Sequence, residues 1–334
     1  MRLPPITLFA ALFLLPFLPL AAQARCTGTD LIAALPAAER AALEQRADSV
    51  PFARGNLFRA TRGGQTIDLV GTYHLADPRH AALQARVAPL LEQADVLLVE
   101  AGPEEETRLK AEVTRRPDFL VLPEGPGLPD LLGEADWQAL AAAMRARGIP
   151  PFVASRFRPW YLAVMLGIPP CAIDAVKAGE KGLDQLLIAE AQARGLPVQA
   201  LEPYDTLFSM FGDLPMQDEL DMVRAALQMA DRPEDMAVTL ANAYFAGRSR
   251  LLWEFTLART PALPGLTPAQ VQDQLALLED VLMVRRNRAW IDVLTGAAAR
   301  GRVLAAFGAL HLPGPQGVPA LLAAEGWQVT RLDE

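Results

Sequence analysis

The sequence is poor in the residues on which most metal-binding and disulfide-rich scaffolds rely. Its 334 residues include only three histidines and two cysteines, which excludes a zinc-finger-like scaffold. The motifs HExxH, GxSxG and GxxxxGK[ST] do not occur, so the standard zinc-protease, serine-hydrolase and P-loop sites are excluded as well. Acidic residues outnumber basic ones, 39 to 31. This balance argues against a nucleic-acid-binding role, because phosphate binding draws on clustered Lys and Arg.

The longest apolar run of the sequence lies at its N-terminus. Leu8–Leu20 follows a single early cation, Arg2, and precedes the small-x-small pattern Ala-Gln-Ala at 22–24. Two prolines interrupt the run, and it is shorter than the roughly 20 residues that a transmembrane helix needs. We therefore predict a signal peptide over residues 1–24, export to the periplasm or the extracellular space, and no stable membrane span after cleavage. Residues 25–334 are expected to form a single soluble domain.

The only cysteines, Cys26 and Cys171, are expected to pair. An even cysteine count in an exported protein favours a bridge, because disulfides persist in oxidising compartments. Two unrelated buried thiols are the alternative. A disulfide requires the two Cα atoms to lie within roughly 7 Å of each other.

Hydrophobic patterns predict strands near both ends of the chain and helices between them. The predicted strands are 56–61, 66–74, 95–100, 198–202, 302–311 and 327–332, and the main predicted helices are 79–93, 182–194, 217–230, 233–246, 268–298 and 316–325. The first strand is expected at a sheet edge, and the loop at 260–267 is a candidate hinge. Together the elements predict an α/β fold: a mixed sheet formed by N- and C-terminal strand–helix–strand units, with a large helical middle segment.

One eight-residue pattern occurs twice, each time directly after a hydrophobic strand. Residues 71–78 and 308–315 share a glycine, a histidine three positions later, a leucine next and a proline three after that. Glycine permits a sharp exit from a strand, and ligands bind beyond the carboxyl ends of strands in open α/β sheets. A single strand-end histidine is usually structural, but a repeated pattern predicts that His74 and His311 converge on one metal or substrate. His80, in the next helix, is expected at the surface.

Two glutamates also stand at predicted strand ends. Glu100 closes an otherwise apolar strand, either as a solvated terminus or as a carboxylate beside His74, where it would act as a metal ligand or a general base. Imidazole and carboxylate together suit zinc, manganese, iron or cobalt. Glu202 repeats this placement and is a weaker candidate. The run 104–106 is expected to be a solvated helix start.

A basic segment interrupts an otherwise apolar helix near the C-terminus. Residues 285–288 read Arg-Arg-Asn-Arg, and a basic helical face is usually solvated. Asn287, however, has poor helix propensity and no capping position nearby, which suggests a buried polar role. Arg286 and Asn287 are therefore candidates for stabilising an oxyanion. Arg156 is a further candidate for anion stabilisation.

Taken together, these residues carry a resemblance to a known family. The segments GTYH, VLLVE, RPWYL, GLDQLL, PVQALE, RRNRAW and FGALHLPGPQGVPALLAAEGWQVTRL, in this order, resemble the TraB/GumN family, which is related to the Tiki and PrgY proteins. The resemblance covers nearly all of residues 25–334, and its C-terminal block is the most specific part. It implies an α/β fold with paired GxxH motifs. For Tiki-like members it also implies metal-dependent peptide cleavage that favours manganese or cobalt.

The resemblance assigns roles to particular residues of this sequence. It implies that His74, Glu100 and His311 are the matching site positions, with Arg286 and Asn287 in support. Family membership alone does not establish an activity, because one fold hosts many functions.

Three functions remain open at this point. The first is a metal-dependent, peptidase-like hydrolase in which His74, Glu100 and His311 hold a divalent metal (manganese, cobalt or zinc) whose bound water becomes the nucleophile. The second is a metal-free hydrolase or transferase that uses a histidine as general base. The third is a non-enzymatic protein that binds or sequesters peptides. The expected ligand is a peptide or a small molecule, and a measurement of bound metal separates the first function from the others.

Overall fold

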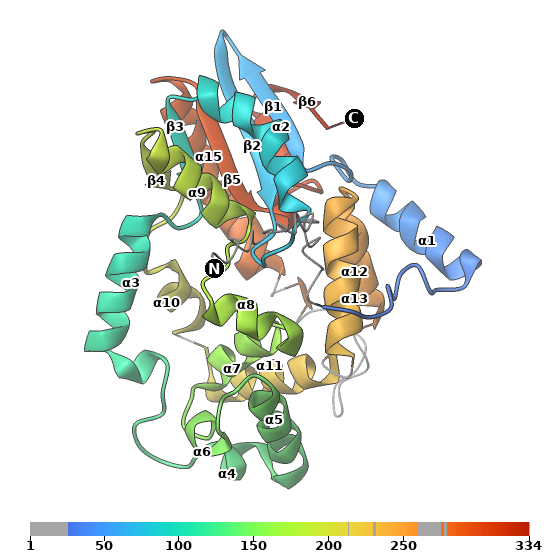
Figure 1. Cartoon of the computed structure of the whole chain (residues 1–334), viewed down its shortest axis with the longest axis vertical. Coiled ribbons are helices and arrows are strands. Elements are labelled where there is room, and N and C mark those ends of the chain that lie inside the picture. Colours follow the sequence, from blue (N-terminus) through green and yellow to red (C-terminus); the bar gives the residue numbers. More distant parts are fainter. Residues whose placement is uncertain (1–25, 213, 230–231, 260–274, 277–278, 334) are drawn as a thin grey trace, which may run out of the picture.

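The computed structural model describes residues 26–333 except 213, 230–231, 260–274 and 277–278 (Figure 1). The predicted signal peptide and the candidate hinge at 260–267 lie outside the described residues. A six-stranded sheet lies at one end of the molecule, and a large group of helices lies beyond the carboxyl ends of its parallel strands (Figure 1). The sheet brings together residues from both ends of the chain.

The sheet is mixed, as the sequence predicts. Its strand order is β4-β3-β5-β2-β1-β6. The strands are β1 (Leu57–Arg62), β2 (Gln65–Thr72), β3 (Val96–Val99), β4 (Val198–Ala200), β5 (Val303–Gly308) and β6 (Gln328–Arg331). The first four strands in this order are parallel, and β1 runs antiparallel to both of its neighbours. The predicted α/β fold is thus confirmed.

Strand β1 is not an edge strand, and in this respect the sequence-based prediction is wrong. It pairs with β2 on one side and with β6 on the other, where Phe58 stands opposite Leu69 and Arg331. Phe58 is 1% exposed. The pairing with β2 is local and follows from the hairpin, whereas the pairing with β6 joins opposite ends of the chain and leaves no local signal.

Helices cover both faces of the sheet. On one face, α2 (His80–Gln93) and α9 (Leu183–Ala193) pack against side chains of β2, β3 and β5. On the other face, α15 (Arg285–Ala298) and α16 (Val318–Ala324) pack against the alternate side chains of the same strands. Strands buried on both faces need nearly continuous apolar sequence, which is why β3 and β5 read Val-Leu-Leu-Val and Val-Leu-Ala-Ala-Phe-Gly.

The remaining helices form the other part of the molecule. They are α1 (Ala37–Asp48), α3 (Pro103–Arg115), α4 (Leu128–Leu132), α5 (Glu134–Ala146), α6 (Pro151–Ala154), α7 (Pro159–Leu166), α8 (Ile173–Lys177), α10 (Thr206–Phe211), α11 (Met216–Met229), α12 (Pro233–Phe245) and α13 (Ser249–Arg259). Helix α13 was not predicted. The described part of the predicted helix 268–298 includes a π-helical turn, Asp280–Val284, followed by α15.

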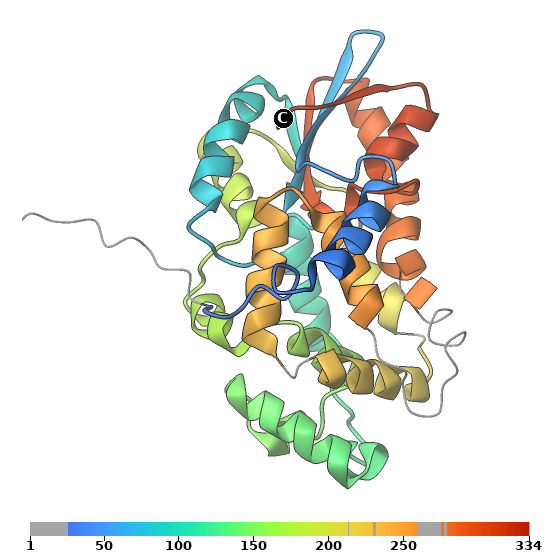
Figure 2. The same ribbon diagram turned by 90° about the vertical axis from the view of Figure 1, so that its right-hand side faces the viewer.

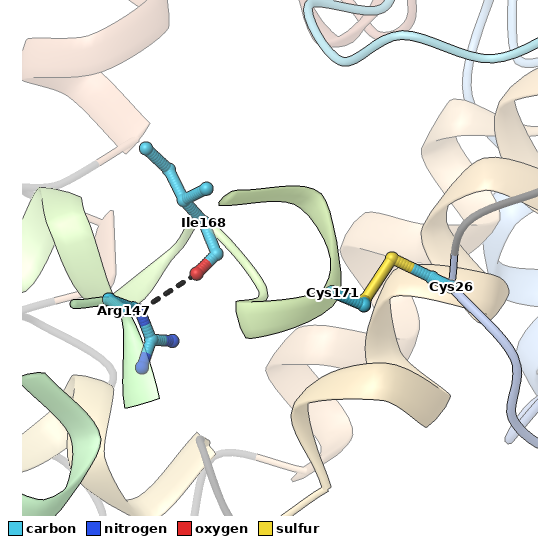
Figure 3. The surroundings of a disulfide bond; sticks show 4 residues. All are labelled: Cys26, Arg147, Ile168 and Cys171. Carbon is cyan, nitrogen blue, oxygen red and sulfur yellow. Dashed lines mark hydrogen bonds between the residues drawn. A yellow bond between two sulfur atoms is a disulfide. The ribbon is translucent and has the colours of Figure 1, made fainter. Parts of the chain in front are cut away.

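The two cysteines form a disulfide, as predicted (Figure 3). The Cα atoms of Cys26 and Cys171 are 5.2 Å apart. On the far side of the turn, Arg147 Nε donates to the carbonyl of Ile168 at 2.8 Å, and the same buried guanidinium binds the carbonyls of Ala143, Met165 and Leu166. The bridge therefore ties the N-terminal segment to a turn that Arg147 holds in place. A bridge of this kind typically contributes about 2–4 kcal/mol.

Among the described residues, no single helix has both the length and the hydropathy to cross a membrane. One bent pair, Pro159–Leu166 with Pro170–Lys177, passes that test by length and composition, with an angle of 82° between its two helices. The first helix of the pair buries Trp160, Leu162 and Leu166 inside the protein.

Candidate functional site

The four parallel strands end level with one another at one edge of the sheet. Thr72 of β2 pairs with Gly308 of β5, and Val99 of β3 pairs with Ala306 of β5 and Ala200 of β4. We call this side of the sheet the carboxyl edge; in Figure 1 it faces α8 and α12. Across it, in strand order, lie Glu202, Glu100, His311 and His74, each within three residues of the end of its strand. The sheet therefore gathers all four sequence-predicted residues.

The candidate side chains meet at Gly308. A Cβ atom built on this glycine would lie 3.2 Å from Glu100 Oε1, 3.4 Å from His74 Nε2 and 3.7 Å from His311 Cδ2. The backbone N–H of Gly308 donates to Glu100 Oε1 at 2.5 Å. The two histidines thus share one site, although they are far apart in the sequence.

In the repeated pattern, glycine at position 71 is required by space and not by backbone conformation. Neither Gly71 nor Gly308 has a positive φ, so the sharp strand exit expected from the sequence is not what requires glycine. A Cβ on Gly71 would lie 2.6 Å from Leu312 Cδ1 and 3.0 Å from Ala309 Cα, both in the second copy of the pattern. The two copies therefore pack directly against each other.

The start of α9 holds the first copy of the pattern. Gly182 packs so closely that a Cβ there would lie 2.3 Å from the carbonyl oxygen of His74, and the N–H of Leu183 donates to Tyr73 O at 3.0 Å. Asp184 Oδ1 then lies 3.3 Å from His74 Nδ1. A carboxylate at this nitrogen fixes the ring and leaves Nε2 facing the site. Sequence reasoning missed Asp184, whose only signal was its place in the GLDQLL segment.

The second histidine is held by α15 and is far less accessible. The His311 side chain is 5% exposed, against 59% for His74. Its Nδ1 lies 2.5 Å from Asn287 Oδ1, and Asn287 Nδ2 donates to the carbonyl of Gln316 at 2.7 Å. The predicted buried polar role of Asn287 is therefore seen. Because both ends of this amide are engaged inside the protein, Asn287 positions His311. Its predicted role in stabilising an oxyanion stays a prediction.

Arg286 joins the two glutamates of the carboxyl edge. Its guanidinium donates to Glu100 Oε2 at 2.7 Å and to both oxygens of Glu202, at 2.7 and 2.8 Å. Arg286 Nη1 is also 3.3 Å from His311 Nε2. Trp290 Nε1 donates to Glu202 at 3.1 Å, and the Trp290 ring lies under the guanidinium. Glu202 is therefore an anchor for Arg286, which places a fixed positive charge inside the site.

The pKa values of the ionisable groups in the site are shifted in different directions. Burial opposes ionisation of Glu100, but the positive charges of His311, Arg286 and His74 lower its pKa to about 2. Burial lowers the pKa of His311 to about 4, so at neutral pH the lasting positive partner of Glu100 is Arg286. Desolvation also acts against a charged His74, but Asp184 and Glu100 outweigh it and raise its pKa above the ordinary value.

Two further residues lie elsewhere than the sequence predicts. His80 is not a surface residue: it is 2% exposed, its Nε2 lies 2.8 Å from Leu75 O, and its ring packs against Phe245. The first turn of α2 points inward here because α12 covers it. Arg156 binds the carbonyls of Leu122 and Gly125 and so ties a loop instead of reaching the site.

The donor types at the carboxyl edge suit a divalent metal, but Arg286 competes for two of them. The two imidazoles direct Nε2 toward the site and have partners at Nδ1, which is the usual arrangement of histidine ligands. However, Arg286 hydrogen-bonds to Glu100 and contacts Nε2 of His311. In the described part of the chain, no group of three or more His, Cys, Asp or Glu side chains is placed to hold a metal ion. The ligand roles of His74, Glu100 and His311 stay predictions.

Comparison with known proteins gives a family match. Residues 56–331 match the family model described as the TraB/PrgY/gumN family. A protein of Escherichia coli strain K12 named "Uncharacterized protein YbaP" is 29% identical over 263 residues, which cover 78% of this chain and 89% of that relative. A Shigella flexneri protein of the same name matches equally, with 29% identity over 263 residues. The matched region contains every residue of the carboxyl edge.

Proposed function

The chain belongs to the TraB/PrgY/gumN family, and from that premise and the carboxyl edge we propose that it is an exported, peptidase-like hydrolase. The observation that carries the proposal is the convergence at Gly308 of two imidazoles and a carboxylate, each held by its own partner. Beside them stands a partly buried cation, Arg286. Sites that combine a general base, an orienting carboxylate and a charge stabiliser are typical of acyl-transfer chemistry.

His74 is the group best placed to activate water. Its side chain is open to solvent, Asp184 lies at Nδ1, and Nε2 faces the site. In the proposed step, Nε2 takes a proton from water as the oxygen attacks the substrate carbonyl. The C–N bond then breaks, and the same proton passes to the leaving amine. Arg286 lies where its charge favours the developing oxyanion, while Glu100 and Glu202 hold the guanidinium in place.

The metal-dependent form of the hydrolase is the second candidate. The paired Nε2 atoms, each with its Nδ1 occupied by Asp184 or Asn287, favour it. A divalent ion bound there would supply a water that is acidic near neutral pH. The position of Arg286 favours the metal-free form, because a metal on Glu100 and His311 would have to share their lone pairs with the guanidinium.

Export is part of the same proposal. The disulfide between Cys26 and Cys171 supports it, because such bridges persist in oxidising compartments. The predicted substrates are accordingly peptides or small molecules found outside the cytoplasm.

The decisive experiment is an activity screen combined with metal analysis. Purified protein is assayed against a library of fluorogenic peptides and esters, with and without a chelator, and its bound metal is measured. Turnover that survives chelation and falls about 10²–10⁴-fold in His74→Ala supports the metal-free form. Turnover that requires one metal ion per chain establishes the metal form instead. Saturable peptide binding without turnover would overturn the hydrolase and leave a peptide-binding protein.

Glu100→Gln sharpens the assignment. The amide keeps the shape of the side chain but removes the negative charge that faces Arg286. In the metal-free form, activity falls with no change in bound metal, whereas in the metal form both fall together. Glu104→Gln is the matched control, because Glu104 is 70% exposed on α3 and pairs only locally with Arg108. Its effect on stability is expected to stay within about 0.5 kcal/mol.

A further inference from the structure

A second cavity, away from His74, is lined by arginines. It has a volume of about 260 Å³ and lies between the loop before β1, the outer side of α2, the turn after α12 and the end of β6. The loop reaches the carboxyl edge, since the N–H of Gly71 donates to Asn56 O at 2.7 Å. Arg79 lines both this cavity and the smaller one beside His74. We call the second cavity the arginine pocket.

The arginine pocket is basic in a protein whose formal charge is −8. The arginines that line it are Arg54, Arg79, Arg86, Arg248 and Arg331, and its one acidic lining residue is Asp333. Two aspartates just outside the lining, Asp48 and Asp77, pair with Arg54 and Arg79. Glu44 also acts on Arg54, so five cations face four carboxylates, and a local excess of positive charge remains. Such an excess raises the local concentration of anions.

One of these arginines has buried donors without acceptors, and another is exposed without a protein partner among the described residues. The Nε and Nη2 atoms of Arg248 are buried and have no hydrogen-bond partner, and the nearest carboxylate, Asp48, lies 3.5 Å from Nη2. That carboxylate already accepts two hydrogen bonds from Arg54. Within the described part of the chain, exposed Arg86 makes no ion pair or hydrogen bond. Buried charged donors without acceptors are costly, so the pocket is built for a ligand that supplies oxygen atoms.

We propose that the arginine pocket binds a small oxyanion, either a phosphate or a carboxylate group of a small molecule. Guanidinium groups match both anions with paired N–H donors. The volume lies just below the usual range for drug-sized ligands, which suits a small organic acid or a phosphate ester. This binding is proposed to be independent of the hydrolysis, because the pocket shares no lining residue with the side chains that meet at Gly308.

Calorimetric titration of the full-length mature protein tests the proposal, with inorganic phosphate and citrate as probes and chloride keeping the ionic strength constant. One of the probes is expected to bind at one site per chain, and the tighter one identifies the anion class. Arg86→Ala and Arg248→Lys are each expected to weaken that binding at least tenfold. Arg145→Ala is the matched control, because Arg145 is exposed at the end of α5, in the helical part of the molecule; it should stay within twofold.

Two results would overturn the proposal: no saturable binding of either probe, or unchanged affinity in both pocket variants. If Arg248→Lys does not fold, Arg86→Ala decides alone, since its exposed side chain can be removed with little effect on stability. His74→Ala, which disables the proposed hydrolase, is expected to bind the probe with wild-type affinity. A failure of one proposal is thereby separated from a failure of the other.

Discussion

The two copies of the Gly-x-x-His pattern place their histidines at neighbouring strand ends but give them opposite surroundings. His74 is 59% exposed and lies 3.3 Å from the carboxylate of Asp184. His311 is 5% exposed and lies 2.5 Å from the amide oxygen of Asn287. Each partner stands near the start of a covering helix: Asp184 in the first turn of α9 on one face of the sheet, and Asn287 in α15, just after the π-helical turn, on the other.

The difference shows that the pattern sets where a histidine stands, while the covering helix sets its chemistry. Although desolvation opposes it, the carboxylate of Asp184, together with Glu100, makes His74 the more basic imidazole, with a pKa above its ordinary value. Burial and a neutral partner keep His311 uncharged, with a pKa of about 4. In the proposed hydrolase, the first copy supplies the base, and the second supplies a buried neutral ring beside Glu100 and Arg286.

The largest expected effect comes from adding a methyl group at Gly182, which packs against His74 in the first copy of the pattern. In Gly182→Ala, the new Cβ would lie 2.3 to 2.6 Å from backbone atoms of His74, so the turn or α9 must move. We expect a loss of about 2–3 kcal/mol in the free energy of unfolding, as for an overpacked core, together with loss of activity. Gly308→Ala meets mainly side-chain atoms at 3.2 to 3.7 Å and should unfold nearer to wild type. Urea denaturation measures both; equal stability of Gly182→Ala and wild type would contradict this close packing of α9 on His74.

Removing each imidazole in turn tests the contrast in burial. His311→Ala opens space in the protein interior and leaves the oxygen of Asn287 without its donor, which costs about 1–3 kcal/mol. His74→Ala removes an exposed ring and should change stability by less than about 0.5 kcal/mol. Thermal unfolding of the two variants side by side gives the comparison. Equal losses would show that the two histidines are not differently buried.

Exchanging the charged partner for a neutral one makes the first copy resemble the second. In Asp184→Asn, the carboxylate that raises the pKa of His74 is gone. Because the general base acts in its neutral form, the rising limb of the pH–rate profile should move to lower pH, and the maximal rate should fall. The profile of kcat/KM is measured on the peptide identified in the activity screen. A limb that does not move would rule out His74 as the titrating base.

The smallest expected effect concerns His80, which lies outside the site. Burial lowers its pKa below the ordinary value, against the opposing hydrogen bond to Leu75. The unfolded chain therefore takes up a proton at higher pH than the folded one. The stability that His80 contributes is complete above about pH 6.5 and is lost as the pH falls through its folded pKa. Unfolding free energies of wild type and His80→Gln between pH 7 and 5 should show a weaker loss in the variant.

Much of the candidate site was predictable from the sequence because its parts are local. Glu100 ends an apolar strand, and the repeated pattern follows two strands of the same kind, so parallel pairing brings their ends together. The buried role of Asn287 followed from an amide that is out of place in a helix. These local patterns can be recognised without knowing which helices and strands are in contact.

The rest depends on contacts between distant segments, which leave no local pattern. Asp184 occupies an ordinary helix-start position until α9 is seen to pack on His74. His80 appears exposed until α12 covers it. Arg286 was a candidate site residue from the sequence, but only the fold shows that two glutamates hold its guanidinium against His311. That contact is what separates the metal-free form from the metal form.

The most direct test of the contrast between the two copies is an NMR titration of the imidazole signals in metal-free wild-type protein. The chain has only three histidines, so single variants assign every signal. The structure predicts that the His74 signal titrates above the ordinary histidine pKa and that the His311 signal stays neutral down to about pH 4. A His311 signal that titrates together with His74, or above it, would contradict the division into one accessible base and one buried neutral ring.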